Sequence, residues 1–423
     1  MSRIIRYLIV ATFVLNFFCS NTGDKSVKGN SNFQTPEILE LEYVLSFGSE
    51  LTGTLEDYFI VGPYNVVVNG NGDIIMPETN VARRALLSAN EIRAYNEYGI
   101  GKAIFSRRGQ GPGEFESMIP VAYPSPDGYI IIKDTESQLG NSYNLFDTQY
   151  KLIRKSRYLS DPLLMGYISD LNVDTATRMI RIKEAFAINA TEMVYGISIE
   201  DEEDFKYHIV YQNDKTLKPL LVVKDPIEVK FQELQGYASS RSGLGKILWC
   251  LVPDRKICYL NPDEDIYNPD GNSYYVVHFI SIDSGEDNSL HRPFTANKID
   301  KKKLLSRPAN SEIQKRMRKY IASRRICWPS TDLVIYFREY IYFYLYDNED
   351  TNKYAYVDIF NAVEGIYINS IDVKEQPLGL PGNRCVYLTD TDEDGFPIIS
   401  RYDIDPVLFK PEGKLYKIVK KVK

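Results

Sequence analysis

The chain has 423 residues, of which 44% are hydrophobic and 13% aromatic, so it can bury a large core. Its formal net charge of −7 produces a field that repels polynucleotides, and we therefore exclude nucleic acid as a partner. The length fits several ordinary domains or one large all-β array, and the pattern along the chain has to decide between them.

The first predicted element is an export signal. Arg3 and Arg6 give a positive start, and residues 7–18 form an apolar run that is short for a membrane span. Residues 1–18 are therefore predicted to be a signal peptide.

Cys19 follows directly and is the predicted lipidation site of a bacterial lipoprotein, with residues 19–36 as a polar tether. Phe18 and Asn16 stand where a usual lipidation box has a small residue and a leucine. Cleavage with soluble release, or an uncleaved anchor, therefore remain alternatives.

Short apolar segments separated by turn residues follow from residue 57 on. In the first unit, the Asn/Gly turn at Gly70 and Gly72 predicts a hairpin. The strands predicted for this unit are residues 64–69, 73–76, 91–95 and 102–105. The same order returns over residues 118–158, at a spacing of about 50 residues that is typical of β-propeller blades.

A glycine-rich turn, residues 106–115, joins these two units. Its distinctive residues are Gly109, Gly111, Gly113 and Phe115, and the next unit continues with Asp127-Gly128 and Phe146-Asp147. Over residues 91–147 the sequence resembles an NHL-type six-bladed β-propeller, including bacterial exported or lipoprotein propellers of unassigned function. The resemblance implies four-stranded blades and a packing role for Arg107, Arg108 and the turn. It implies nothing about activity, because this fold supports many functions.

Four less regular units continue the pattern. They cover residues 167–223, 246–282, 332–371 and 384–419. The sixth unit takes residues 414–419 as its third strand and lacks an outer strand, which residues 41–47 are predicted to supply. The N-terminal strand would then close the last blade and remove the open sheet edge. We therefore expect residues 37–423 to form one all-β, six-bladed β-propeller.

One segment breaks the β pattern. Residues 308–325 predict a helix, because Ser311 and Gln314 have the spacing of a capping box ahead of an apolar stripe. Residues 301–325 are strongly basic and contain a single acid, Glu312. This insertion on one face of the propeller is either a solvated helix or a surface for anionic partners, such as lipid headgroups or acidic glycans.

The sequence offers two candidate metal sites. Asp390, Asp392 and Asp394 alternate ahead of a glycine, as in the first half of a calcium loop. Because Arg401 replaces the final glutamate of such a loop, a plain Asp-Gly hairpin turn is the alternative reading. The chain has only three histidines, His208, His278 and His291, which argues against a histidine metal site. Calcium is the one cofactor that remains in consideration.

Two further groups have open interpretations. Cys250 and Cys258 flank a predicted turn and are either buried free thiols or a bridge across the hairpin. The tyrosine-rich residues 336–346 either pack between blades or present rings for stacking on sugars or peptides.

The sequence has no nucleophile motif and no phosphate loop. We therefore expect an exported, membrane-tethered monomer, in the periplasm or on the outer-membrane surface, that is a non-catalytic binding or scaffold module. Its partner would be a cell-envelope protein, a glycan or a small ligand at the channel mouth. The alternative is a propeller lyase or hydrolase that acts on a glycan or small ester through channel carboxylates. Convergent carboxylates with raised pKa would favour the enzyme, and an aromatic-lined polar mouth would favour binding.

Overall fold

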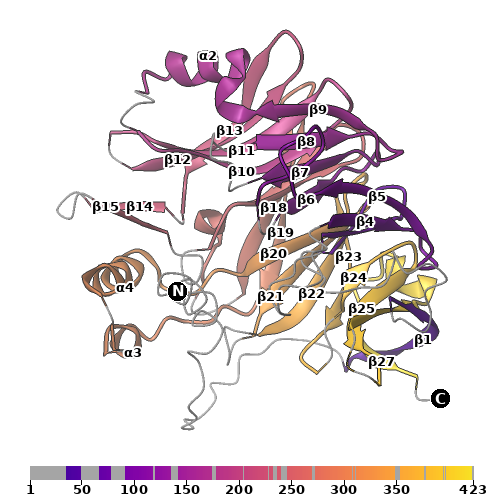
Figure 1. The fold of residues 1–423 in the computed structure, drawn as a ribbon. Coiled ribbons are helices and arrows are strands. Elements are labelled where there is room, and N and C mark those ends of the chain that lie inside the picture. Colours follow the sequence, from indigo (N-terminus) through magenta and orange to yellow (C-terminus); the bar gives the residue numbers. More distant parts are fainter. Residues whose placement is uncertain are drawn as a thin grey trace.

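The computed structural model describes residues 35–48, 66–77, 91–117, 120–134, 142–173, 178–202, 204–226, 228–231, 236–239, 245–268, 272–306, 308–309, 311–347, 353–375, 378–393, 395 and 397–421. In these residues, β-sheets stand around a common axis (Figure 1). The chain is therefore an all-β propeller, as the sequence predicts.

Four of the described sheets contain four antiparallel strands each, in sequential order. Sheet I contains β2 (Val67–Val68), β3 (Ile74–Pro77), β4 (Glu91–Tyr95) and β5 (Gly101–Arg107). Sheet II contains β6 (Val121–Pro124), β7 (Ile130–Asp134), β8 (Ser142–Phe146) and β9 (Leu152–Arg157). Sheet III contains β10 (Ile180–Ala187), β11 (Met193–Glu200), β12 (Phe205–Gln212) and β13 (Leu217–Lys224). Sheet IV contains β16 (Leu248–Val252), β17 (Lys256–Leu260), β18 (Ser273–Ser281) and β19 (Asp287–Phe294).

A nine-stranded sheet, sheet V, completes the ring. Its strands, in spatial order, are β20 (Thr331–Phe337), β21 (Tyr340–Tyr346), β22 (Tyr354–Asn361), β23 (Ile366–Asp372), β27 (Leu415–Lys420), β1 (Glu37–Phe47), β26 (Pro397–Asp403), β25 (Cys385–Thr391) and β24 (Leu380–Pro381). The described sheets thus differ from the expected set of separate four-stranded blades, because β27 links two antiparallel units into one sheet.

The N-terminal strand pairs with the end of the chain, as predicted. β1 runs antiparallel to β26, with Glu42 opposite Asp403. The predicted order of the last strands is wrong, because β27 lies outside β1 and pairs in parallel with both β1 and β23. Residues 404–414, which contain the short helix η5 (Pro406–Phe409), form a connection long enough to step over one strand position.

The first strand of each unit lines the axis. β2 contacts β6, β6 contacts β10, β16 contacts β20, β20 contacts β24, and β24 contacts β2. Hydrophobic clusters fill the junctions between successive units. At the junction that closes the ring, Phe47 of β1 packs on Tyr95 of β4 with ring centroids 5.5 Å apart. Each buried aromatic side chain at this junction stabilises the closed propeller by about 1.5–3 kcal/mol.

Middle and outer strands differ in composition for a physical reason. β7 is buried along its whole length, because both faces of a middle strand pack on neighbouring sheets. β9 alternates between half-buried and exposed residues, because one of its faces meets solvent. This alternation is the pattern from which the sequence predicts strands.

Helices and one extra hairpin connect the sheets. They are α2 (Pro162–Asp170), α3 (Lys301–Ser306), α4 (Glu312–Arg324), and the hairpin of β14 (Glu228–Phe231) and β15 (Gly236–Ser239). The third unit therefore begins at Ile180 and not at Tyr167, which lies in α2. Among the described residues, no helix is both long enough and apolar enough to cross a membrane.

Candidate functional site

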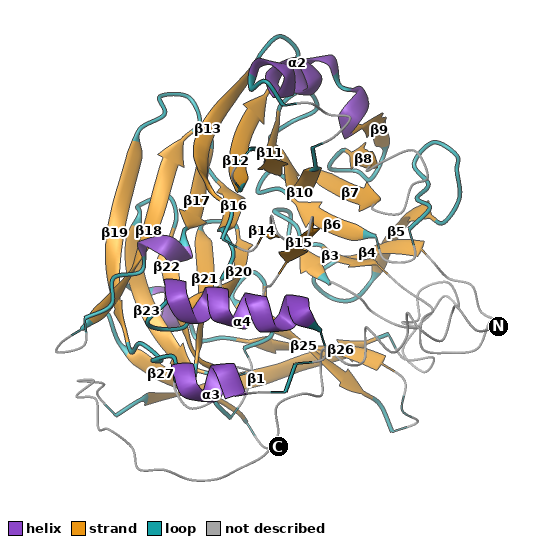
Figure 2. Cartoon of the chain, turned by 90° about the vertical axis from the view of Figure 1, so that its left-hand side faces the viewer, coloured by secondary structure: helices purple, strands orange, loops and turns teal. Residues whose placement is uncertain are grey.

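The two faces of the propeller carry different connections. On one face, which we call the turn face, first and second strands join through short turns, as do third and fourth strands. The described turns of this face are residues 69–73, 96–100, 125–129, 147–151, 188–192, 213–216, 253–255, 282–286, 338–339, 362–365 and 382–384. The other face, the insertion face, carries α2, the β14–β15 hairpin, α3 and α4. In Figure 1 α2 lies at the top of the molecule and the other three along its left-hand side. Figure 2 views this face. Long connections of this kind are where propellers and other rigid scaffolds carry their sites.

The glycine-rich turn is a packing element. Phe115 is completely buried, and its carbonyl accepts a hydrogen bond of 2.8 Å from the Gly109 N–H. The Glu114 carboxylate accepts bonds from the Gly111 N–H at 2.8 Å and from Arg107 Nε at 3.0 Å. A Cβ on Gly109 would lie 2.1 Å from Glu114 Oε2, so a larger residue there would displace this carboxylate from its hydrogen bonds. Phe115 therefore has the packing role that the resemblance implies, whereas Arg107 and Arg108 are exposed and do not pack between blades.

Aromatic rings fill the axis at one level. The Phe186 ring on β10 lies 5.5 Å from that of Tyr123 on β6, 4.8 Å from that of Trp249 on β16 and 6.0 Å from that of Tyr336 on β20. Since β10 and β20 are not neighbours in the ring, a contact between them crosses the axis. A ligand at the channel mouth stays a prediction.

A carboxylate stands beside this aromatic group. The Trp249 indole N–H donates to the Tyr207 hydroxyl at 2.8 Å, and that hydroxyl donates to Glu184. Burial, followed by the nearby Glu184 charge, raises the pKa of Tyr207 well above its ordinary value. Tyr207 therefore stays a protonated donor, and the chain Trp249–Tyr207–Glu184 fixes the carboxylate.

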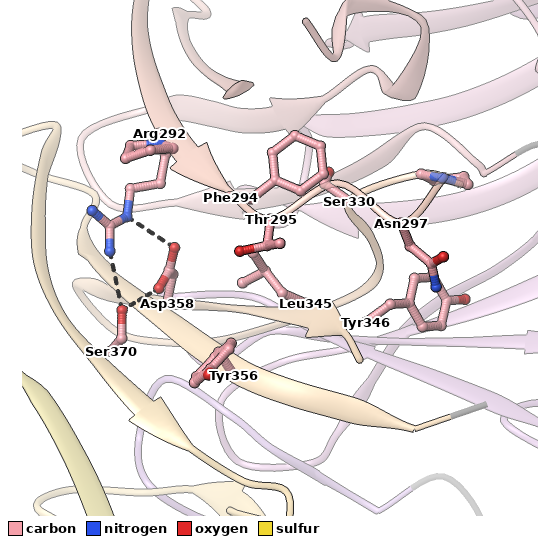
Figure 3. A pocket seen from close by; sticks show the side chains of 12 residues that line it. Arg292, Phe294, Thr295, Asn297, Ser330, Leu345, Tyr346, Tyr356, Asp358 and Ser370 are labelled. Atoms are coloured by element: carbon pink, nitrogen blue, oxygen red, sulfur yellow. Dashed lines mark hydrogen bonds and ion pairs between the residues drawn. The ribbon is translucent and has the colours of Figure 1, made fainter. Parts of the chain in front are cut away.

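A crevice lies between sheets IV and V (Figure 3). Arg292 donates from Nε to Asp358 at 2.9 Å and from Nη2 to Ser370 at 3.1 Å, and its guanidinium lies 3.5 Å from the centroid of the Tyr367 ring. The Tyr275 hydroxyl donates to Asp358 at 2.6 Å. The space in the crevice is ≈ 20 Å³, enough for about one water molecule. The crevice therefore has little room for a ligand, and its ion pair holds two sheets together.

A larger cleft opens where the N- and C-terminal strands meet, with a volume of ≈ 620 Å³. We call it the seam cleft. It is lined by Glu40, Glu42, Asn383, Arg384, Arg401, Asp403, Ile404, Asp405, Pro406 and Lys421. Its size is in the range of small-molecule sites, although its walls are more polar than those of most such sites.

The charged groups of the seam cleft are only partly paired. Arg401 bonds Asp403 at 3.2 Å and Glu97 at 3.4 Å, and Lys421 lies 3.7 Å from Glu40. Arg384 is exposed, and among the described residues its guanidinium forms no ion pair. The cleft can therefore offer a guanidinium to a ligand without breaking an existing contact.

The predicted helix lies where the sequence places it. The Ser311 hydroxyl accepts a hydrogen bond of 3.2 Å from the Gln314 N–H, which confirms the cap. At the other end of α4, Arg325 bonds Asp263 at 2.7 Å and Arg324 bonds the same carboxylate. Asp263 belongs to the short helix η4 (Pro262–Glu264), so α4 is fixed to sheet IV.

Asp265 is the one described carboxylate whose pKa is raised. Burial raises the pKa of Asp265 to about 7. The hydrogen bonds that the carboxylate accepts from the Ser330 N–H at 2.9 Å and from the Ser330 hydroxyl at 3.3 Å lower the pKa, but by less than burial raises it. Among the described carboxylates, there is thus no convergent pair of the kind that would favour the enzyme. The sequence shows Asp263 and Asp265 as one of several acidic pairs in loops, which are solvated by default. It gives no signal for the raised pKa of Asp265, because Ser330, which hydrogen-bonds this carboxylate, is distant in the chain.

The three histidines are apart and have different surroundings. His208 is buried, with Nδ1 2.8 Å from the Tyr167 hydroxyl. His278 lies between Glu264 at 2.7 Å and Asp287 at 3.0 Å, and these carboxylates outweigh burial and raise its pKa. In the described part of the chain, no group of three histidine, cysteine or acidic side chains is placed to hold a metal ion.

The calcium candidates fall only partly within the structure. Asp390 is in β25, and the Asp392 carbonyl accepts a 3.0 Å bond from Gly395, whose φ is 79°. This is the geometry of the alternative hairpin turn. Asp394 lies outside the described residues, so calcium binding stays a prediction. Cys19 and the signal and tether before residue 35 also lie outside them.

The remaining candidates have structural roles. Cys250 and Cys258 lie opposite each other in β16 and β17 as buried free thiols. In the tyrosine-rich hairpin, Tyr342, Phe343 and Tyr344 are buried. Their burial matches packing between blades.

No family model matches the chain, and no curated protein matches it. Solved structures similar to it include a candidate exported protein from Bacteroides fragilis, with 11% identity, coverage of 89% of this chain and 98% of that chain, and a TM-score of 0.43. The calcium-binding protein regucalcin from Agrobacterium tumefaciens has 11% identity, coverage of 84% and 94%, and a TM-score of 0.33. The β-propeller domain of the Trilobed protease from Pyrococcus furiosus has 9% identity, coverage of 84% and 97%, and a TM-score of 0.32. The fold assignment rests on the sheets of this chain itself.

Proposed function

We propose that this chain is an exported, lipid-anchored propeller that binds a small envelope ligand in the seam cleft without transforming it. The observation that carries the proposal is the open, ≈ 620 Å³ cleft with the available guanidinium of Arg384 in its wall. Among the described carboxylates only Asp265 has a raised pKa, and a single carboxylate of this kind supports binding over acid/base catalysis, which needs a pair.

We propose that this propeller has six blades. Sheet V divides at β27 into two antiparallel four-stranded units, β20–β23 and β24–β25–β26–β1. With sheets I to IV, these make six units whose first strands lie around the axis. The NHL-like turn at residues 106–115 fits this count.

Export and anchoring rest on the N-terminal sequence. Arg3, Arg6 and the apolar residues 7–18 have the order of a signal peptide, and Cys19 follows where a lipid would be attached. The protein would then act as a monomer in the periplasm or on the outer-membrane surface. Labelling cells with an alkyne palmitate tests the anchor: the label should disappear in Cys19→Ala, and label that survives would refute acylation at this residue.

The ligand is expected to carry both an anionic group and hydrogen-bond donors. Arg384 attracts an anionic group, while the exposed carboxylates of Glu42 and Asp405 accept from donors. A peptide end or an amino sugar has both groups. A simple anion would be repelled by the acidic side chains that outnumber the basic ones in the cleft.

Thermal-shift screening of short peptides and amino sugars tests this function. A ligand of the seam cleft should stabilise the protein, and Arg384→Gln should weaken its binding by roughly 10-fold or more. Arg107→Gln, which changes an exposed arginine of the glycine-rich turn, is the matched control and should bind normally. Equal binding by Arg384→Gln and the parent chain would contradict a ligand site in this cleft.

A further inference from the structure

The insertion formed by α3 and α4 is basic, whereas the rest of the chain is acidic. Residues 301–325 contain ten lysines and arginines and one acid, Glu312, and so carry +9 in a chain whose total is −7. The rest of the chain therefore carries −16. An extended anionic surface attracts the insertion and repels the remainder, which would orient the propeller with its insertion face toward that surface.

The structure shows which cations are available. On α4, Met317 and Ile321 are buried against the protein. Lys315, Lys319 and Ser323 are exposed, and their spacing of four residues puts them on one face of the helix. The arginines at the end of α4 already bond Asp263. Lys315 lies 3.6 Å from Glu312 in an exposed pair, which is weak in water. The exposed lysines therefore remain available to a partner.

Helix α3 extends the same basic surface. Lys301, Lys302 and Lys303 are exposed, while Leu304 is buried in the small core that α3 shares with α4. Figure 2 shows α3 and α4 side by side on the insertion face, and the shared core agrees with this placement.

Exposed aliphatic side chains lie among these cations. Leu305 in α3 is 50% exposed, Ile326 directly after α4 is 55% exposed, and Ile266 is 46% exposed. Ile266 follows Asp263 by three residues and Ile326 follows Arg325 directly, so both flank the ion pair that fixes α4. Lysines around exposed aliphatic groups are typical of surfaces that bind at a membrane interface.

We propose that the α3–α4 insertion docks on the anionic phospholipid surface of a bilayer. The lysines of α3 and α4 contact headgroup phosphates, and Leu305 and Ile326 enter the interface. In a chain acylated at Cys19, the segment up to Thr35 spans at most about 55 Å, which keeps the propeller close to the bilayer that holds the anchor. The inference is independent of the seam cleft, because no residue of the insertion lines that cleft.

Vesicle sedimentation tests the docking without help from an acyl chain. The processed full-length protein carrying Cys19→Ala is mixed with vesicles of phosphatidylcholine alone, or of equal parts phosphatidylglycerol and phosphatidylcholine. We expect partitioning only onto the anionic vesicles, and loss of most of it between about 50 mM and about 500 mM salt. Neutralising Lys301, Lys315 and Lys319 to glutamine should weaken partitioning by on the order of 100-fold.

The control changes the same charge elsewhere. Lys151→Gln/Lys215→Gln/Lys410→Gln neutralises three lysines that are exposed outside the insertion and should partition like the parent chain. Leu305→Ser should lower the partitioning that remains at high salt. Far-UV circular dichroism shows that each variant is folded. No partitioning onto anionic vesicles, or an equal loss in both triple variants, overturns the proposal. So does binding to an acidic protein or glycan in place of the vesicles.

Discussion

At the scale of single residues, Gly196 occupies a position where close contacts leave no room for a side chain. Gly196 on β11 faces the hydrogen-bonded group of Glu184, Tyr207 and Trp249. A Cβ at this position would lie 2.2 Å from Tyr207 Oη and 2.9 Å from Trp249 Nε1. The position therefore admits only glycine without displacing rings that are packed near the axis.

Gly196→Ala should lower the free energy of unfolding by about 3 kcal/mol, because the buried rings must shift and their hydrogen bonds are strained. Gly166→Ala is the matched control: this glycine lies in α2 with no atom within 4 Å of an added Cβ, so alanine should stabilise by about 0.5–1 kcal/mol. Urea denaturation measures both. A neutral effect of Gly196→Ala would contradict the close packing at this site.

His208 makes stability depend on pH. Burial lowers its pKa from 6.5 to about 4, so the folded state holds the neutral imidazole. The unfolded chain binds a proton at the ordinary pKa. The contribution of His208 to the free energy of unfolding is therefore complete above pH 6.5 and is lost as pH falls toward 4.

Replacing His208 by glutamine should remove this part of the acid sensitivity, which amounts to about 3 kcal/mol. Midpoints of urea denaturation measured from pH 7 to pH 4 test the expectation, with His291→Gln, an exposed histidine, as the control. If both variants lose stability with pH as the parent does, His208 is not the group that titrates.

At the scale of elements, β1 is the strand on which closure depends. It pairs with β26 on one side and with β27 on the other. Leu41 of β1 is completely buried between sheet units, whereas Ile38 is 61% exposed. The strand therefore joins the two ends of the chain through both its hydrogen bonds and its apolar side chains.

Leu41→Ala should cost about 2–5 kcal/mol of unfolding free energy because it leaves a cavity at the closure, while Ile38→Ala should change it by less than about 0.5 kcal/mol. Equilibrium denaturation gives both values. A small effect of Leu41→Ala would mean that the ring does not depend on β1.

Elements with strong local signals were predictable. Ser311 caps α4 as expected, and the Asn/Gly turn at residues 69–73 closes a hairpin, because both depend on groups a few residues apart. α2 was missed although Asp161 caps it with bonds of 2.9 Å to the Leu163 N–H and 3.1 Å to the Leu164 N–H, and Pro162 occupies the first turn. Asp-Pro ahead of an apolar segment was the signal that could have identified it.

At the scale of the whole molecule, both termini contribute to one sheet. The Ser46 and Ser400 hydroxyls lie 2.7 Å apart although 354 residues separate them. Opening the propeller at this point separates the first described strand from the last ones. We therefore expect the sheets to unfold together.

Thermal unfolding should give coincident transitions by far-UV circular dichroism and tryptophan fluorescence. The two tryptophans report on different places, since Trp249 packs near the axis and Trp328 packs against the α3–α4 core. An early fluorescence transition that vanishes in Trp328→Phe would show instead that the insertion unfolds on its own.

The sequence by itself determined the all-β class, the blade-like units and the basic helix. Alternation with period two, glycine turns and helix caps act between residues that are neighbours in the chain, so the pattern of residues is sufficient to show them. The predictions of a signal peptide and of lipidation at Cys19 likewise rest on the sequence alone.

Only the tertiary structure decided the order of β1 and β27, the linked sheet V, the seam cleft and the contact of α4 with Asp263. Each depends on which distant segments come together: Arg384 and Glu42 meet in one cleft because the N-terminal strand inserts beside β26. The local preference of each segment for a β-strand is compatible with many strand orders. The burial of apolar side chains over the whole propeller selects one of them.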